Sequence, residues 1–180
     1  MFEIFGKGDF SDDLAEHLLT FTYLESSVEI IKSNYIENQH DISTSIEKKA
    51  QEKFRKDYFE FISDFLSSEE FNQFIAAYRV DRKIVSALRI IEMESGVWLE
   101  EALETAPECR RNGYSFKLVE KLIESVRERN GKVIVANIGR SNKASRNLHI
   151  KLGFRETTKL AIDESGNVFK NQVRYEYRLK

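Results

Sequence analysis

Residues 97–129 constrain the fold of this chain more than any other segment. A strand-like run ends at Thr105, Pro107 blocks its continuation, and a basic loop with one glycine leads into an amphipathic helix. This order directs free backbone N–H groups and the positive end of the helix dipole at one point, where phosphate groups bind. We therefore expect an anion site where the helix begins. The alternative is an ordinary strand–loop–helix with Arg110 and Arg111 in solvent.

The hydrophobic pattern of the whole chain predicts an α/β fold, with a mixed sheet that carries helices on both faces. The expected strands are 1–5, 71–80, 84–93, 97–105, 132–137, 154–162 and 172–179. Helices are expected in 44–65, 113–129 and 142–152, and residues 34–45 are expected to form a loop. A first helix, with Ser11 as its N-cap, is expected from apolar side chains at helical spacing: Leu14, Leu18 and Phe21, then Val28, Ile31 and Tyr35.

Two helices contain stripes of side chains that we expect to be buried. A capping box at Thr44 and Glu47 opens the first of them. Its stripe consists of Ala50, Phe54, Tyr58, Phe61 and Phe65. In the last helix, the inward side chains are Ala144, Leu148 and Leu152, and Gly153 ends the helix. An aromatic stripe can also line a pocket, but more often it is simply core.

Length and composition predict one compact domain over residues 1–180. One cysteine, Cys109, excludes an internal disulfide, and three scattered histidines do not make the usual zinc cluster, so no metal is expected. No run of the sequence has the roughly 18 apolar residues of a membrane span, and the N-terminus does not read as a signal peptide. These features predict a cytoplasmic protein.

Charge is distributed unevenly along the chain. Residues 1–70 contain 16 acidic and 7 basic side chains, whereas residues 71–180 contain 14 acidic and 21 basic ones. The asymmetry fits an anionic ligand on the C-terminal part and a cationic one near the N-terminal part. It fits equally well two solvated surfaces that happen to differ in sign.

Two motifs resemble the GNAT superfamily of acyl-CoA-dependent N-acyltransferases. The first is the phosphate loop, here Arg110, Arg111, Asn112, Gly113, Tyr114 and Ser115, with serine in place of the last small residue and Pro107 three positions upstream. The second is an Asn-initiated helix that ends in Lys-Leu-Gly-Phe, at residues 142–154. The resemblance covers residues 71–180 well, and covers 1–70, which would shape the acceptor site, only by element order. It implies a mostly antiparallel sheet whose central strands splay apart.

The resemblance also implies how acetyl-CoA would bind. The pantetheine arm would lie between strands 97–105 and 132–137, paired with backbone groups around Leu103 and Thr105. Backbone N–H groups of the phosphate loop would hold the pyrophosphate. Asn142 and Ser145, at the start of the last helix, would contact the cofactor, although Asn142 would also serve as a plain N-cap.

Direct acyl transfer needs a base for the amine and donors for the oxyanion and the thiolate. Glu104 lies beside the expected thioester, and Glu100 or Glu101 would relay a proton through water. Strand alternation puts Glu100 and Glu104 on one face and Glu101 on the other, unless a bulge intervenes. Surface charge is the alternative role of each glutamate.

Three further positions bear on the chemistry. His149 falls seven residues after Asn142, where many resembling enzymes have a tyrosine that protonates the departing thiolate. We expect His149 at the edge of the buried stripe, where it would act as this general acid. Its alternative is to pack on the helix or to contact pantetheine. Asn137 stands five residues before Asn142, where the peptide N-terminal acetyltransferases of ribosomal-protein type have a glutamate that acts as the general base. Asparagine does not take up a proton, so that subfamily is not expected. Cys109 lies in the phosphate loop, away from the thioester, so we expect no acyl-enzyme route.

The sequence thus predicts an acetyl-CoA-dependent N-acetyltransferase that acts on a primary amine of a small molecule or peptide. The alternative is a catalytically weak CoA-binding regulatory or interaction domain, which Asn137 and the missing tyrosine favour. Nucleic-acid binding is not expected, because no aromatic-basic motif or recognition helix is present. Many members of the superfamily are dimers, so a homodimer is possible, and the acidic 1–70 segment weakly favours a cationic acceptor.

Overall fold

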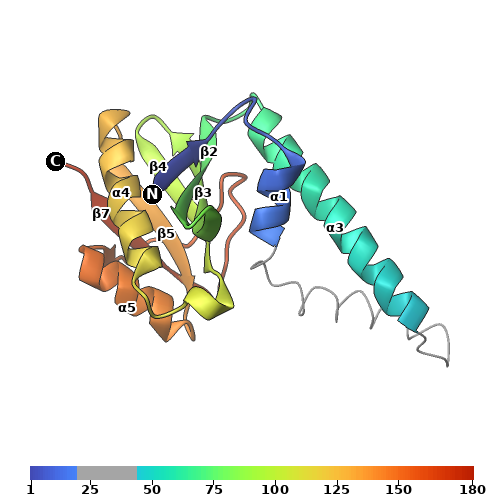
Figure 1. The fold of residues 1–180 in the computed structure, drawn as a ribbon. Coiled ribbons are helices and arrows are strands. Elements are labelled where there is room, and N and C mark those ends of the chain that lie inside the picture. Colours follow the sequence, from blue (N-terminus) through green and yellow to red (C-terminus); the bar gives the residue numbers. More distant parts are fainter. Residues whose placement is uncertain (20–43) are drawn as a thin grey trace.

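The computed structural model describes residues 1–19 and 44–180, which form one seven-stranded sheet with helices on both faces (Figure 1). The strands are β1 (Phe2–Phe5), β2 (Gln73–Val80), β3 (Lys83–Glu94), β4 (Val97–Thr105), β5 (Val133–Gly139), β6 (Arg155–Glu156) and β7 (Gln172–Arg178). The helices are α1 (Asp12–Leu19), α3 (Thr44–Ser67), α4 (Tyr114–Glu128) and α5 (Lys143–Leu152), with a 3₁₀ turn at Pro107–Cys109. The expectations for Phe21, Val28, Ile31, Tyr35, the loop and the side chains of Thr44, Glu47 and Ala50 lie outside the described residues.

The strand order is β1-β2-β3-β4-β5-β7-β6, and β4–β5 is the parallel pair in an otherwise antiparallel sheet. These two strands pair from Val97 opposite Val133 to Glu100 opposite Ala136, and no further. Beyond Glu100, β4 continues to Thr105 without a β5 partner. The predicted splay of the central strands is therefore confirmed, and Glu100 marks the fork.

A bulge interrupts β4 immediately after the fork. Arg89 of β3 lies opposite Glu101, and Ala87 lies opposite Glu104, so three residues of β3 face four of β4. The extra residue is accommodated at Ala102, whose φ is +47°. A left-handed residue at a bulge bends the strand and reverses the alternation of the side chains that follow.

The bulge changes which glutamates share a face. The expected pairing of Glu100 with Glu104 on one face is wrong, because the extra residue moves Glu104 to the face of Glu101. Glu100 points to the face covered by α4 and α5, whereas Glu101 and Glu104 point to the face covered by α1 and α3.

Each face of the sheet has its own core. The larger one joins β-strand side chains to Leu118, Val119, Leu122 and Val126 of α4. The smaller one joins the other face to Leu14 and Leu18 of α1 and to Ile62, Phe65 and Leu66 of α3. Ser11 caps α1 as predicted, since its hydroxyl accepts a hydrogen bond from the N–H of Leu14 at 3.1 Å.

The aromatic stripe of α3 is only partly buried. Phe65 is buried, but Phe61 is 42% exposed, and Phe54 and Tyr58 are half-buried. The reason is that the last turns of α3 pack on the sheet while its earlier turns project beyond it (Figure 1). The prediction of a fully buried stripe was therefore wrong in this part of the helix.

The predicted strand over 154–162 is also shorter than expected. Only Arg155–Glu156 pairs with β7, after which the chain leaves the sheet and forms an isolated bridge between Ile162 and Val168. The side chain of Asp163 accepts hydrogen bonds from the N–H groups of Ser165 and Asn167, which favours a turn over a strand there. Among the described residues, no helix is both long and apolar enough to cross a membrane.

Candidate functional site

A groove of about 880 Å³ runs between the end of β4, the loop before α4, and α5. It is lined by all the residues predicted to contact the cofactor except Asn112: Leu103, Thr105, Arg110, Arg111, Gly113, Tyr114, Ser115, Asn142 and Ser145. The side chain of Asn112 instead donates a hydrogen bond to the carbonyl of Cys109 at 3.2 Å. Sequence reasoning missed other lining residues, of which Phe116, Asn147 and Lys151 carry no recognisable signal.

The loop before α4 has the geometry of an anion site. The 3₁₀ turn after Pro107 and the positive φ angles of Arg111 (+64°) and Gly113 (+77°) curl the backbone in front of the helix. In the part of the chain that the structure describes, the backbone N–H groups from Arg111 to Phe116 have no hydrogen-bond acceptor. A Cβ atom built on Gly113 would meet no atom of residues 1–19 or 44–180 within 4 Å. Free donors and open space therefore coincide at the helix end.

Ser115, which replaces the usual last small residue of the loop, has its hydroxyl turned toward β4. Its Oγ lies 2.5 Å from Oγ1 of Thr105, which lies 3.0 Å from Oγ of Ser86. The Ser86 hydroxyl in turn donates to the carbonyl of Glu104 at 2.7 Å. This chain of hydroxyl groups ties the anion loop to the end of β4.

Asn142 is the N-cap of α5, which was one of the two roles expected for it. Its Oδ1 accepts a hydrogen bond from the N–H of Ser145 at 3.1 Å, and both residues line the groove. Capping uses the carbonyl oxygen of the side chain and leaves its amide N–H group for a ligand in the groove.

The expected inward face of α5 needs correction. Ala144 is exposed and Leu148 is half-buried, and both line the groove instead of the core. The buried side chain of the helix is His149, which is 1% exposed and is not among the groove-lining residues. An apolar groove wall and an apolar core impose the same residue types, so the sequence pattern did not distinguish the two sides of the helix.

His149 forms a buried pair with Glu100. The His149 Nε2 atom lies 3.0 Å from Oε1 of Glu100, and both side chains are 2% exposed. The Nδ1 atom lies 2.8 Å from the carbonyl oxygen of Ser145, and the ring packs edge-on against Phe154. Burial lowers the pKa of His149, but the charge and hydrogen bond of Glu100 and the Ser145 carbonyl outweigh it and raise the pKa above 6.5.

Glu104 stands where the groove meets a second cavity, of about 220 Å³, on the α1/α3 face of the sheet. Burial raises the pKa of Glu104 to about 7, against the lowering fields of Arg89 and Arg110. Its Oε2 atom is buried and has no hydrogen-bond partner among the residues that the structure describes. A carboxylate with these properties gains or loses a proton near neutral pH, as a general base must.

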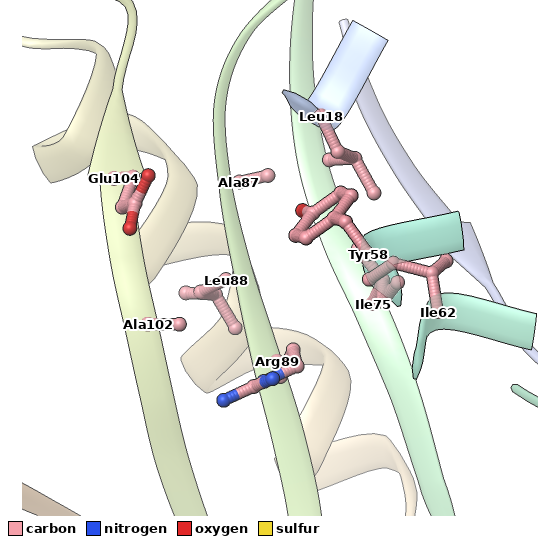
Figure 2. Close-up of a pocket in the computed structure, with 9 residues that line it drawn as sticks. All are labelled: Leu18, Tyr58, Ile62, Ile75, Ala87, Leu88, Arg89, Ala102 and Glu104. Atoms are coloured by element: carbon pink, nitrogen blue, oxygen red, sulfur yellow. The ribbon is translucent and has the colours of Figure 1, made fainter. Parts of the chain in front are cut away.

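Figure 2 shows the second cavity between the sheet and the two helices of that face. Leu18 and Tyr58 come from the helices and face Glu104, Ala102 and Arg89 on the strands. Arg89 bonds to Glu101 at 3.3 Å, and its guanidinium carbon lies 4.6 Å from the ring centroid of Phe61. Sequence reasoning did not identify Arg89, because only the bulge brings Glu104 to the side of the sheet that Arg89 and Glu101 share.

Glu101 lies in acidic surroundings. Burial raises the pKa of Glu101, Arg89 opposes this, and the negative charges of Glu164 and Asp163 raise the pKa further. The last two residues belong to the turn between β6 and β7, so this turn brings negative charge toward the α1/α3 face. Glu100 lies on the opposite face and is sealed from the groove.

Two further positions singled out in the sequence, Asn137 and Cys109, are given no catalytic role by their surroundings. The side-chain amide of Asn137 donates to the carbonyl of Ile162 at 2.7 Å and so fastens the segment after β6 to β5. Cys109 is a half-buried free thiol on the groove wall. Within residues 1–19 and 44–180, no group of three or more His, Cys, Asp or Glu side chains is arranged to hold a metal ion.

Comparisons with known proteins agree with this geometry. Residues 36–154 match the family model described as the acetyltransferase (GNAT) family. The fold resembles the PaiA N-acetyltransferase of Thermoplasma acidophilum in complex with coenzyme A, with a TM-score of 0.61 and 14% identity over 99% of each chain. It also resembles a probable acetyltransferase from Staphylococcus epidermidis, with a TM-score of 0.62 and 13% identity over 100% of this chain and 99% of that one. A comparison with curated proteins gives no match.

Proposed function

This chain belongs to the GNAT acetyltransferase family, and on that premise we propose that it transfers an acetyl group from acetyl-CoA directly to a primary amine of a small molecule or a peptide. One observation carries the proposal. Glu104, whose pKa is raised to about 7, is the described residue that lines both the groove with the anion loop and the cavity on the opposite face. The two substrates would meet at this carboxylate.

The residues of the groove fit acetyl-CoA. The unbonded N–H groups after Arg111 would hold the pyrophosphate, with charge added by Arg110 and Arg111. The pantetheine arm would enter the fork and pair with the edge of β4 at Leu103 and Thr105, as an added strand does. Asn142 would offer its side-chain amide from the other wall.

Glu104 would take one proton from the acceptor ammonium, since a primary amine with a pKa near ~10 is protonated at neutral pH. The neutral nitrogen then attacks the thioester carbon and forms the carbon–nitrogen bond, and the carbon–sulfur bond breaks. The second proton that the nitrogen must lose to become an amide passes to the departing thiolate, which leaves as the thiol of CoA. Backbone N–H groups of β4 beyond the fork would stabilise the oxyanion, because this edge has no β5 partner. His149 lies behind the groove wall and does not line the groove, so we assign it no part in the acyl-transfer step itself.

The charge around the cavity supports a cationic acceptor. Glu101 and Glu104 are half-buried there, and Asp163 and Glu164 lie close enough to raise the pKa of Glu101. Arg89 is the cationic side chain among the described residues of the cavity wall. A positively charged amine would be attracted to this site and would be delivered to the base that neutralises it.

The test measures thiol release from acetyl-CoA across a library of primary amines, with wild type, Glu104→Gln and Glu108→Gln. Glu108 is an exposed carboxylate in the nearby 3₁₀ turn that does not line the groove, so it is the matched control. We expect Glu104→Gln to lower kcat/KM by about 10²-fold or more with unchanged CoA affinity, as removal of a general base does. Full turnover in Glu104→Gln would contradict the proposal.

A further inference from the structure

Both ring nitrogens of His149 face oxygen atoms that accept hydrogen bonds. Nδ1 faces the backbone carbonyl of Ser145 at 2.8 Å and the hydroxyl oxygen of the same residue at 3.4 Å, and Nε2 faces Oε1 of Glu100 at 3.0 Å. The carbonyl is the nearer of the two oxygens and only accepts hydrogen bonds, so Nδ1 must carry a proton to satisfy this shorter contact. The contact between Nε2 and Glu100 also needs a proton, which must be carried either by Nε2 or by the carboxyl group of Glu100.

A neutral imidazole has one N–H group, and Nδ1 uses it. If Glu100 is ionised, Nε2 must also be protonated, which makes the ring an imidazolium. If the ring is neutral, Glu100 must be protonated and donate to Nε2. In both cases the pair holds one shared proton. Water does not substitute for it readily, because both side chains are 2% exposed.

The pair joins two parts of the groove. Glu100 is the last residue of β4 that pairs with β5, so it sits at the fork. His149 is on α5, whose other side lines the groove through Ser145 and Leu148. Ser145 links the two sides directly, because its carbonyl contacts His149 and its N–H is capped by Asn142. Movement of His149 away from Glu100 would therefore move the groove wall.

We propose that the proton shared by Glu100 and His149 is a positioning device for acyl-CoA, which holds the α5 wall of the groove against the fork. The proposal rests on the proposed function, since it assumes that this groove binds acyl-CoA. When the proton leaves, either the Ser145 contact or the Glu100 contact must break, because one N–H group does not serve two acceptors. CoA affinity should then fall while the acyl-transfer step itself is unchanged.

Few other groups act on the ring. Glu100, from β4, is the charged side chain that shifts the pKa of His149, and from its own helix the Ser145 carbonyl adds a hydrogen bond. Phe154, in the segment after α5, presents an uncharged ring at a centroid distance of 4.9 Å. Because the pKa of His149 lies above 6.5, the pair should be intact at pH 6.5 and lost as pH rises through the raised value.

The test measures the Kd of CoA by calorimetry from pH 6.5 to pH 9.5 for wild type, Glu100→Gln and Glu124→Gln. A glutamine at position 100 donates its amide N–H to Nε2 of a neutral ring, so both contacts survive without the extra proton. We expect the Kd of wild type to rise about tenfold more than that of Glu100→Gln across this range. Glu124 is an exposed carboxylate on α4 outside the groove, so Glu124→Gln should follow wild type. At saturating acetyl-CoA, kcat should be the same in all three.

Parallel pH profiles in wild type and Glu100→Gln would overturn the proposal, and so would a fall in kcat without a change in Kd. If Glu100→Gln fails to fold, the paired variant Glu100→Leu/His149→Leu replaces the pair with apolar side chains, which buried ion pairs often tolerate. It too should lose the pH dependence, and a profile like that of wild type would overturn the proposal. If wild type binds no CoA at any pH, the proposed function fails first, which is a distinguishable result.

Discussion

The two faces of the sheet treat their carboxylates differently. On the α4/α5 face, Glu100 is sealed from solvent and hydrogen-bonded to a histidine. Each of the two carboxylates has one buried oxygen without a hydrogen-bond partner among the described residues, but Glu104, on the α1/α3 face, lines an open cavity and has a pKa raised to about 7. The two residues lie four apart on one strand, separated by a bulge. A single extra residue thus separates a carboxylate that fixes structure from one that is free to react.

The largest expected effect tests whether the α4/α5 face is the binding face. Wild type at ~100 times the Kd of CoA should gain about 2.7 kcal/mol of stability. Gly113→Glu places a negative side chain in the anion site and should abolish this gain, as measured by thermal unfolding with and without CoA. Gly8→Glu is the matched control, since Gly8 also has a positive φ and no described atom near its Cβ position, and it does not line the groove. Undiminished stabilisation in Gly113→Glu would mean that phosphate binds elsewhere.

The next prediction tests whether the ionised form of Glu104 lowers the free energy of unfolding. Its pKa is raised above the ordinary 4.5, so its contribution to stability is fully present below pH 4.5 and is lost as pH rises through about 7. Glutamine does not ionise, so Glu104→Gln should be more stable than wild type at pH 8 by about 1 kcal/mol, after discounting for solvent screening. Urea unfolding at pH 8 and pH 4 measures this. A destabilised Gln variant at pH 8, or a difference that persists at pH 4, would refute it.

Salt should have a smaller effect, confined to the acceptor side. Raising the ionic strength shortens the Debye length from ~10 Å at 0.1 M to ~3 Å at 1 M, which screens the carboxylates around the cavity. With acetyl-CoA kept saturating, the KM of a cationic acceptor should rise by roughly fivefold, which corresponds to about 1 kcal/mol. An uncharged acceptor should show no such rise. A KM indifferent to salt would indicate that apolar contacts, and not charge, select the amine.

The smallest effect concerns the bulge that separates the two faces. Ala102 has a φ of +47°, a conformation that costs a side-chain-bearing residue about 1–2 kcal/mol. Ala102→Gly should therefore stabilise the fold by about 0.5 kcal/mol, once the greater chain entropy of glycine is subtracted. The control Ala87→Gly, in the buried part of β3, should destabilise it. Chemical denaturation decides between them, and a destabilising Ala102→Gly would show that the bulge is held without strain.

The anion loop and the capped last helix were predictable because each depends on local chemistry, whereas the fork was expected only from the resemblance to the GNAT superfamily. Pro107, Gly113 and Asn142 each impose a backbone conformation or a cap that the sequence displays directly. The bulge was not predictable, because alanine is not a residue that indicates a left-handed position, and alternation counts assume an unbroken strand. Its consequence, the transfer of Glu104 to the Glu101 face, was therefore missed.

The prediction of which side of α5 faces the core was wrong for a different reason. A groove that accepts a ligand and a core that packs on a sheet both select small or apolar side chains, so Ala144 and Leu148 were assigned to the wrong side. His149 was placed near the buried edge, but its sealed pairing required Glu100 from 49 residues earlier. Contacts between distant segments of this kind depend on the sheet register, which a single sequence does not display.

The hydroxyl chain from Ser115 through Thr105 to Ser86 has a consequence for transplanting this site. The Ser86 hydroxyl is hydrogen-bonded to the backbone carbonyl of Glu104, so the loop that we propose to bind the nucleotide and the strand that carries the proposed base are held together by one chain of hydrogen bonds. Grafting the segment 107–115 onto another scaffold would transfer the anion-binding loop without the hydrogen bonds that fix its position relative to Glu104. We expect that Thr105 and Ser86 would have to be grafted as well for Glu104 to keep its position relative to the bound thioester.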